Sequence, residues 1–419
     1  MKKILALLSC IVFCLAVCAC ATTEGDKNPN LEQTTETESN KPIETNTPET
    51  DEETTADTTE NGEETAPPVV DDNSMFVYPT DLRASVVDYI RTMATTKWTP
   101  KETFTLSGKY QSWSYKLTYQ KGVTYLGPPF LMNSRGTQMA FNDNLINGVY
   151  VGGTTNADCI GSACYDAVYL ALASISPSIS FKSTEDMLPK NNTGLLPVGD
   201  WNWEASKFDT PTITRANSQD VMANAFAKLQ PGDVVMRHIV AQDAGHARII
   251  SEKPVINYYP NGKINPNTSY ITTIEQTNIW YGVSYKHTTW WENEKYTFST
   301  LYNQSYVPLT LKEYTETPEP AFIKGEDITP ASDIKTVTEL DGRLTSNHLI
   351  QKVVIAIKDE NGKVVHSVSS YPTSKEVWLS DIELDFDMTQ LAKGSYTFTI
   401  DASLYIGTKN MASYSFTVE

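Results

Sequence analysis

The stretch NADCIGSACYDAVYLALA, residues 156–173, is the segment from which the fold of this 419-residue chain is best approached. Its apolar residues recur every three or four positions, as on one face of a helix: Ile160, Ala163, Cys164, Ala167, Val168 and Ala171. Asp158 stands just before this pattern, and an aspartate there accepts hydrogen bonds from the free N–H groups of a first turn. The stretch therefore predicts one amphipathic helix with Asp158 as its N-cap.

The two cysteines of this stretch, Cys159 and Cys164, are the only ones beyond residue 20. Five positions on a helix separate their Cα atoms by roughly 8–9 Å, whereas a disulfide needs less than about 7 Å, so we expect no bridge between them. Cys164 lies inside the apolar stripe and is predicted to be a buried structural thiol. Cys159 lies in the first turn, where the helix dipole stabilises a thiolate; it is either the nucleophile of an active site or a plain small residue.

A catalytic cysteine needs a base and a group that orients the base. Among the five histidines, His246 begins a predicted strand and His238 ends the preceding one, which makes His246 the candidate base and His238 its rival. The next strand, SYITTIEQTNIW, offers Glu275 on one face and Gln276 with Asn278 on the other. The sequence leaves open which face meets the histidine.

These residues carry a family resemblance. The order DC, then LxPGD, then GH at a strand start resembles the NlpC/P60 cysteine peptidases, and IEQTN is similar to the related CHAP branch of the papain-like enzymes. The resemblance spans roughly residues 120–280. It implies Cys159 as nucleophile, His246 as base and Glu275 or Gln276 as orienting group. It also implies Tyr150, in YVGGTTNADCIG, as a substrate contact, whereas Tyr150 taken alone is typical of a core aromatic residue. Ile160 stands where the family has serine, and 87 positions separate Cys159 from His246, which implies an insert.

The N-terminal residues predict export. Residues 1–20, MKKILALLSCIVFCLAVCAC, have two lysines, a short apolar run and an ending that resembles a bacterial lipobox, with Cys20 as the lipidated residue. Residues 21–75 are rich in Thr, Glu and Asn and predict a disordered tether. The tether carries most of the net charge of −18 and leaves about −6 for residues 76–419. We therefore expect an extracytoplasmic protein anchored to the membrane by lipid.

The remaining chain predicts an α+β fold in two domains. Residues 76–315 are expected to form an NlpC/P60-type domain in which a helix carrying the cysteine packs on a small antiparallel sheet. Residues 316–330 read as a linker, and residues 331–419 as an all-β, immunoglobulin-like sandwich with a hairpin at Asn361-Gly362.

Together these features predict a cell-surface cysteine hydrolase that cleaves an amide bond, with peptidoglycan stem peptides as the expected substrate. Arg248, beside the predicted base, is a candidate for binding a substrate carboxylate. No HExxH, CxxC pair or phosphate-binding loop motif occurs, so we expect no metal and no cofactor. The acidic balance argues against a nucleic-acid partner. The alternative is a non-catalytic surface-binding or adhesion lipoprotein.

Overall fold

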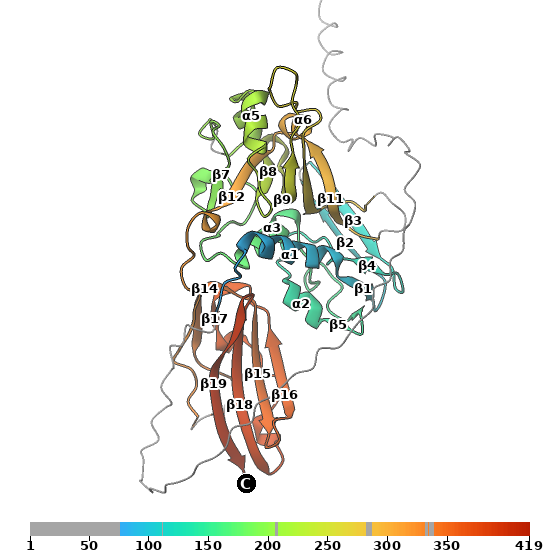
Figure 1. Ribbon diagram of the computed structural model, residues 1–419. Helices are drawn as coiled ribbons and strands as arrows, with labels where there is room; N and C mark the ends of the chain where they lie inside the picture. Colours follow the sequence, from blue (N-terminus) through green and yellow to red (C-terminus); the bar gives the residue numbers. More distant parts are fainter. Residues whose placement is uncertain (1–75, 111, 206–207, 282–286, 332–333, 335–338) are drawn as a thin grey trace, which may run out of the picture. The chain divides into compact units, whose positions relative to one another are not determined.

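The computed structural model describes residues 76–419, apart from residue 111 and residues 206–207, 282–286, 332–333 and 335–338 (Figure 1). The predicted signal peptide, Cys20 and the tether lie outside the described residues.

The predicted fold class is wrong. The protein is mostly β, with 38% strand and 19% helix, and its strands form several sheets. The largest sheet is not small: it has six strands in the order β11-β10-β9-β8-β12-β7, and every neighbouring pair is antiparallel. Its strands are β7 (Leu195–Pro197), β8 (Val234–Ile239), β9 (Ala244–Val255), β10 (Tyr270–Gln276), β11 (Trp290–Thr297) and β12 (Val307–Leu311). The three strands predicted around His238, His246 and Glu275 are confirmed as β8, β9 and β10.

The helix predicted from residue 158 begins later, so it does not carry Cys159. Helix α3 runs over Cys164–Ala173. The residues before it are extended: the Ser162 N–H donates to Pro129 O (3.1 Å) and the Gly136 N–H to Gly161 O (2.9 Å). A side chain at Gly161 would lie 2.6 Å from the Pro129 oxygen, so only glycine allows this approach. Backbone pairing with a distant segment therefore replaces the first predicted turn.

Asp158 caps a local loop instead of the helix. Its carboxylate accepts hydrogen bonds from the backbone N–H and the hydroxyl of Thr155, each at 2.7 Å. Ala163 is the residue before α3, and its backbone N–H donates to Asp166 Oδ2 at 3.4 Å. The predicted N-cap role of Asp158 is thus wrong, because its carboxylate binds Thr155 and not the N–H groups of a helix.

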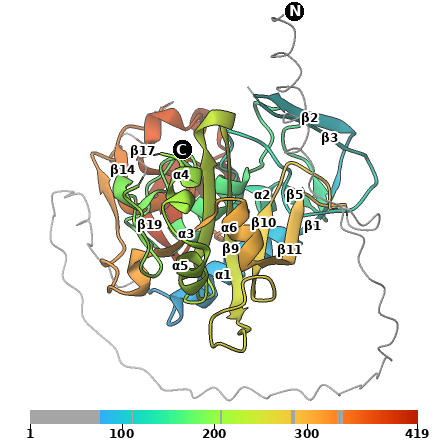
Figure 2. The same cartoon turned by 90° about the horizontal axis from the view of Figure 1, so that it is seen from above.

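Two helices pack next to the six-stranded sheet and against each other (Figures 1 and 2). Helix α1 (Leu82–Thr95) begins at an N-cap, Asp81, whose carboxylate accepts from the Ala84 N–H, and buries Val86, Tyr89, Ile90 and Met93, as the apolar spacing predicts. Helix α3 buries all ten of its residues and contacts β9 and β10. A shorter helix, α5 (Gln219–Phe226), begins after its N-cap Ser218. Two further short helices are α4 (Thr210–Arg215) and α6 (Phe298–Asn303).

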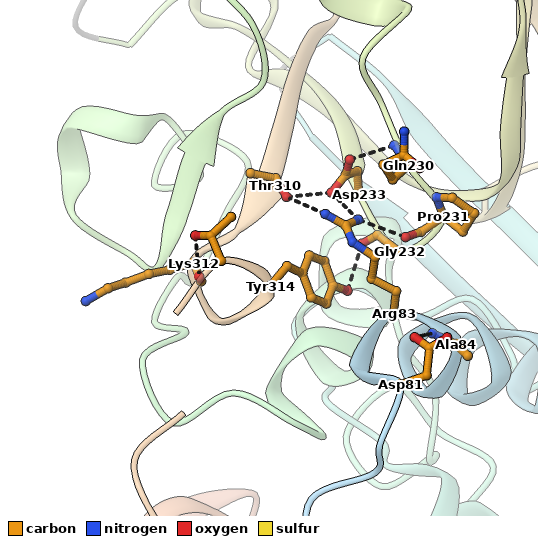
Figure 3. A network of polar contacts seen from close by, with 11 residues as sticks. Asp81, Arg83, Ala84, Gln230, Pro231, Gly232, Asp233, Thr310, Lys312 and Tyr314 are labelled. Carbon is orange, nitrogen blue, oxygen red and sulfur yellow. Dashed lines mark hydrogen bonds and ion pairs between the residues drawn. The ribbon is translucent and has the colours of Figure 1, made fainter. Parts of the chain in front are cut away.

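A partly buried ion pair joins α1 to the sheet. Arg83 Nη1 lies 2.7 Å from Asp233 Oδ1, and the same carboxylate accepts from Thr310 Oγ1 (2.6 Å) and from the Gln230 N–H (2.7 Å), as Figure 3 shows. The guanidinium also lies 4.0 Å from the centre of the Tyr314 ring. The PGD motif that ends in Asp233 therefore has a structural role, joining α1, β8 and β12.

A second, aromatic core lies beside this sheet. It is formed around Trp98, Phe104, Tyr119, Phe141 and Tyr150, and it also contains Cys159 and Cys164. Its secondary structure is β1 (Lys97–Pro100), β2 (Phe104–Lys109), β3 (Ser114–Tyr119), β4 (Tyr125–Leu126), α2 (Gln138–Asp143), β5 (Leu145–Ile146) and β6 (Val149–Tyr150). The β2–β3 hairpin lies at the periphery of the view in Figure 2.

The C-terminal strands form two antiparallel sheets around a core of their own. One sheet has the order β13-β14-β17 and the other β16-β15-β18-β19. Their bounds are β13 (Ile323–Glu326), β14 (Arg343–Ile350), β15 (Lys352–Asp359), β16 (Val364–Ser370), β17 (Ser374–Trp378), β18 (Gly394–Leu404) and β19 (Gly407–Val418). The hairpin at Asn361-Gly362 is confirmed, with Gly362 at φ +77°. Residues 316–330 are not a plain linker, because β13 lies within them and pairs with β14.

Across the part of the chain that the structure describes, no helix is long and apolar enough to cross a membrane.

Candidate functional site

His246 and Glu275 meet on neighbouring strands of the six-stranded sheet. His246 lies near the start of β9 and Glu275 near the end of β10, and the Nε2 atom of His246 contacts the Oε2 atom of Glu275. Glu275 is 1% exposed and the His246 side chain 14% exposed. Of the orienting groups that the sequence left open, the structure therefore brings Glu275 to His246.

Gln276 points elsewhere. Its Oε1 atom accepts from Ser162 Oγ at 2.5 Å, and its Nε2 atom donates to Pro128 O at 3.1 Å. The amide is fully buried, and it ties β10 to the extended segment before α3. Asn278 follows the end of β10 and is half-buried. Gln276 thus supports the backbone that leads to Cys164 and does not contact the histidine.

Arg248 holds Glu275 from the other side. Its Nε atom donates to Glu275 Oε2 at 2.8 Å, and the Tyr296 hydroxyl donates to Glu275 Oε1 at 2.7 Å. The guanidinium is stacked between two rings, 3.8 Å from the Tyr296 centroid and 4.4 Å from that of Tyr306. The substrate-binding role predicted for Arg248 does not fit this position, because the side chain is 8% exposed and its charge is paired with Glu275.

The charges of this group define which nitrogen of His246 carries the proton. Arg248 and His246 lower the pKa of Glu275 to about 2 although burial raises it, so the carboxylate is ionised and accepts only. The His246 nitrogen in contact with it, Nε2, must then be the protonated one. Burial lowers the pKa of His246, so at neutral pH the ring is neutral and its Nδ1 atom has a free lone pair.

Cys164 lies next to this pair. It is the first residue of α3, and the backbone N–H groups of Ala247 and Tyr165 lie close enough to its sulfur to lower the pKa of the thiol. Ala247 directly follows His246, so the sulfur lies one residue from the candidate base on β9. Burial raises the pKa of the Cys164 thiol to about 12, and the two N–H groups lower it, as does any donor to a thiolate. The predicted structural thiol is therefore the one beside His246 and Glu275.

Cys159 lies in the aromatic core. The Tyr150 hydroxyl lies 3.9 Å from its sulfur, and the same hydroxyl accepts from the Ile160 N–H at 3.0 Å. Cys159 is 5% exposed, and burial raises the pKa of its thiol to about 12. Tyr150 is 1% exposed and packs against Trp98 and Phe141, so it is a core residue and not an open substrate contact. Both cysteines are free thiols, as their predicted separation requires.

His238 has a different environment from His246. It ends β8 opposite Gly245, and its Nδ1 atom lies 3.0 Å from Thr184 Oγ1. A side chain at Gly245 would lie 1.8 Å from the same hydroxyl. The close approach of Thr184 therefore requires glycine at position 245. This contact explains why glycine precedes His246 in the GH motif.

Helix α3 begins at Cys164 and not at Cys159, and the sequence contains a signal for this later start. Gly161 and Ser162 would have stood in the first turn of a helix begun at Asp158, and both are poor helix formers. Asp166, three residues beyond Ala163, fits the N3 position of a helix begun at Cys164.

The described residues contain no group of three or more His, Cys, Asp or Glu side chains placed to hold a metal ion. No protein-family model and no curated protein matches the chain.

Proposed function

We propose that this protein is a cysteine-dependent hydrolase that cleaves an amide bond, with Cys164 as nucleophile, His246 as base and Glu275 as the group that orients the base. The observation that supports this most directly is the contact of the ionised Glu275 with His246 Nε2. The next residue, Ala247, has a backbone N–H close enough to the Cys164 sulfur to lower the pKa of the thiol. The thiol at a helix N-terminus is the nucleophile, the neutral imidazole is its base, and the buried carboxylate orients the imidazole.

The reaction follows from these protonation states. Both Cys164 and His246 are neutral at rest, so His246 Nδ1 takes the thiol proton as the sulfur attacks the amide carbon. The imidazolium formed is stabilised by the Glu275 carboxylate, and it then protonates the leaving amine. Water hydrolyses the thioester, again with His246 as base, which releases the acid and the free thiol.

The N-terminus of α3 supplies a second element of catalysis. The first N–H groups of a helix have no partner within the helix, and its dipole favours negative charge there. The N–H of Cys164 stands at this position in a ten-residue helix. We assign it as a donor to the oxyanion of the tetrahedral intermediate.

The substrate and location are proposed from the sequence alone. A signal with a lipobox-like Cys20 and a long polar tether would hold the domain outside the cytoplasmic membrane, close to the cell wall. Peptidoglycan is the polymer of the cell wall, and its stem peptides contain amide bonds. These stem peptides are the proposed substrate. The membrane lipid anchor and this peptide substrate are the proposed partners.

Paired single substitutions test the assignment. Cys164→Ala is expected to lower hydrolysis of purified peptidoglycan fragments by about a thousandfold or more, whereas Cys159→Ala, a matched substitution at the other buried thiol, should leave measurable turnover. Product amines are quantified by mass spectrometry, and circular dichroism verifies that each variant is folded. Turnover that depends on Cys159 and not on Cys164 would overturn the assignment. Undiminished turnover in both variants would refute a cysteine mechanism, and no turnover in the parent protein would favour the surface-binding alternative.

A further inference from the structure

A hollow of about 410 Å³ lies at the start of α3, the helix whose first residue is the proposed nucleophile. Its lining includes Tyr165 and Asp166, the two residues that follow Cys164 in α3, together with Asn133, Arg135 and Lys182. The hollow therefore adjoins the N-terminus of the helix that carries the sulfur.

Arg135 is held rigidly at this hollow. Its Nε atom lies 3.2 Å from Asp166 Oδ1, its Nη2 atom donates to Phe181 O at 2.7 Å, and the guanidinium lies 4.1 Å from the centre of the Tyr169 ring. The side chain remains 26% exposed, and its Nη1 atom takes part in neither of these two polar contacts. A planar guanidinium that is fixed by its neighbours and still partly exposed is suited to bind a carboxylate.

Lys182 adds a second positive charge. Its side chain is exposed and forms no ion pair with a described residue. The one acidic group of the lining is Asp166, which is already bound to Arg135 and whose pKa is raised by burial to about 7. The hollow therefore attracts anions at neutral pH.

We propose that this hollow binds a carboxylate on the acyl part of the substrate, the part that remains attached to Cys164 during the reaction. This inference rests on the proposed function. The carboxylate belongs either to the residue whose carbonyl is attacked or to the residue before it. The enzyme thus prefers acidic peptides to their amidated or basic counterparts, through Arg135 and Lys182.

Peptidyl chloromethyl ketones test the proposal without knowledge of the natural substrate. These probes alkylate a catalytic cysteine, and the rate at Cys164 is followed by mass spectrometry of the intact protein. Three probes carry Glu, Gln or Lys at the residue bearing the reactive group, and three more carry these residues one position earlier. The Glu probe of one set should react about tenfold faster than its Gln partner, since a charge-assisted hydrogen bond contributes roughly that factor. The set that shows the preference identifies which carboxylate binds.

Exposed Lys182 allows a substitution that leaves the fold intact. Lys182→Gln should lower the Glu-to-Gln rate ratio severalfold, and Lys182→Glu should favour the Lys probe. Lys253→Gln, at an exposed lysine of β9 away from the hollow, should change neither ratio. Equal rates for all probes, with labelling that still depends on His246, would overturn this inference while leaving the hydrolase proposal intact. If no probe labels Cys164 and His246→Ala has no effect on its reactivity, the proposed function fails as well.

Discussion

Arg248 and Glu275 form a buried ion pair. Removing one charge should lower both stability and activity, whereas removing both charges should restore part of the stability but not the activity. The pKa of Glu275 is lowered from 4.5 to about 2, which corresponds to about 3 kcal/mol in favour of the ionised form. Arg248→Met takes away the cation and strands a carboxylate that is 1% exposed. We expect the free energy of unfolding at pH 7 to fall by about 3–5 kcal/mol, the usual cost of breaking one half of a buried pair. Glu275→Gln should cost a similar amount, because it strands the guanidinium.

The double variant Arg248→Met/Glu275→Gln carries neither charge. Its loss of stability should be smaller than the sum of the two single losses by about 2 kcal/mol or more. Activity should not recover with stability, because His246 no longer has a carboxylate at Nε2 to stabilise its protonated form.

Urea unfolding followed by tryptophan fluorescence at pH 7 measures all three variants. Lys263→Met serves as the control: it breaks the ion pair with Asp220, in which both side chains are more than half exposed, and should change stability by less than about 1 kcal/mol. Strictly additive single effects, or an Arg248→Met protein within about 1 kcal/mol of the parent, would refute the reasoning. So would a double variant with full turnover.

Three further predictions follow from the surroundings of the site. Gly245→Ala should destabilise the protein by about 1–3 kcal/mol, because the added carbon would meet Thr184 Oγ1 at 1.8 Å; urea unfolding checks this, and Thr184→Ala should relieve it. The pKa of Asp166 is raised to about 7, so the folded state binds an extra proton between about pH 4 and 7 and stability falls as pH rises through that range. Asp166→Asn should remove this pH dependence of the free energy of unfolding, as measured by unfolding curves between about pH 4 and 7. If the free energy falls with pH as steeply in the variant as in the parent protein, the prediction is wrong. Because burial raises the pKa of the Cys164 thiol to about 12, its alkylation by iodoacetamide should keep accelerating above pH 9, and a plateau near neutral pH would show a preformed thiolate instead.

Local patterns in the sequence determined several elements of this protein. The apolar spacing from Leu82 to Met93 determined α1, because a buried helix face is set by residues only three or four positions apart. Alternation determined β8, β9 and β10, and it separated Glu275 from Gln276 onto opposite faces. Asn361-Gly362 determined a hairpin in the same local way.

Tertiary structure decided the features that depend on partners far along the chain. The start of α3 is one: backbone pairing of residues 161–162 with residues 129–136 moved it from Cys159 to Cys164, and with it the cysteine that lies beside His246. The partner of His246 is another, because the pairing of β9 with β10 and the cation of Arg248 select Glu275. Hydrogen bonds between distant backbones and the burial of charge depend on which segments meet, and periodicity within a segment contains no information about that meeting.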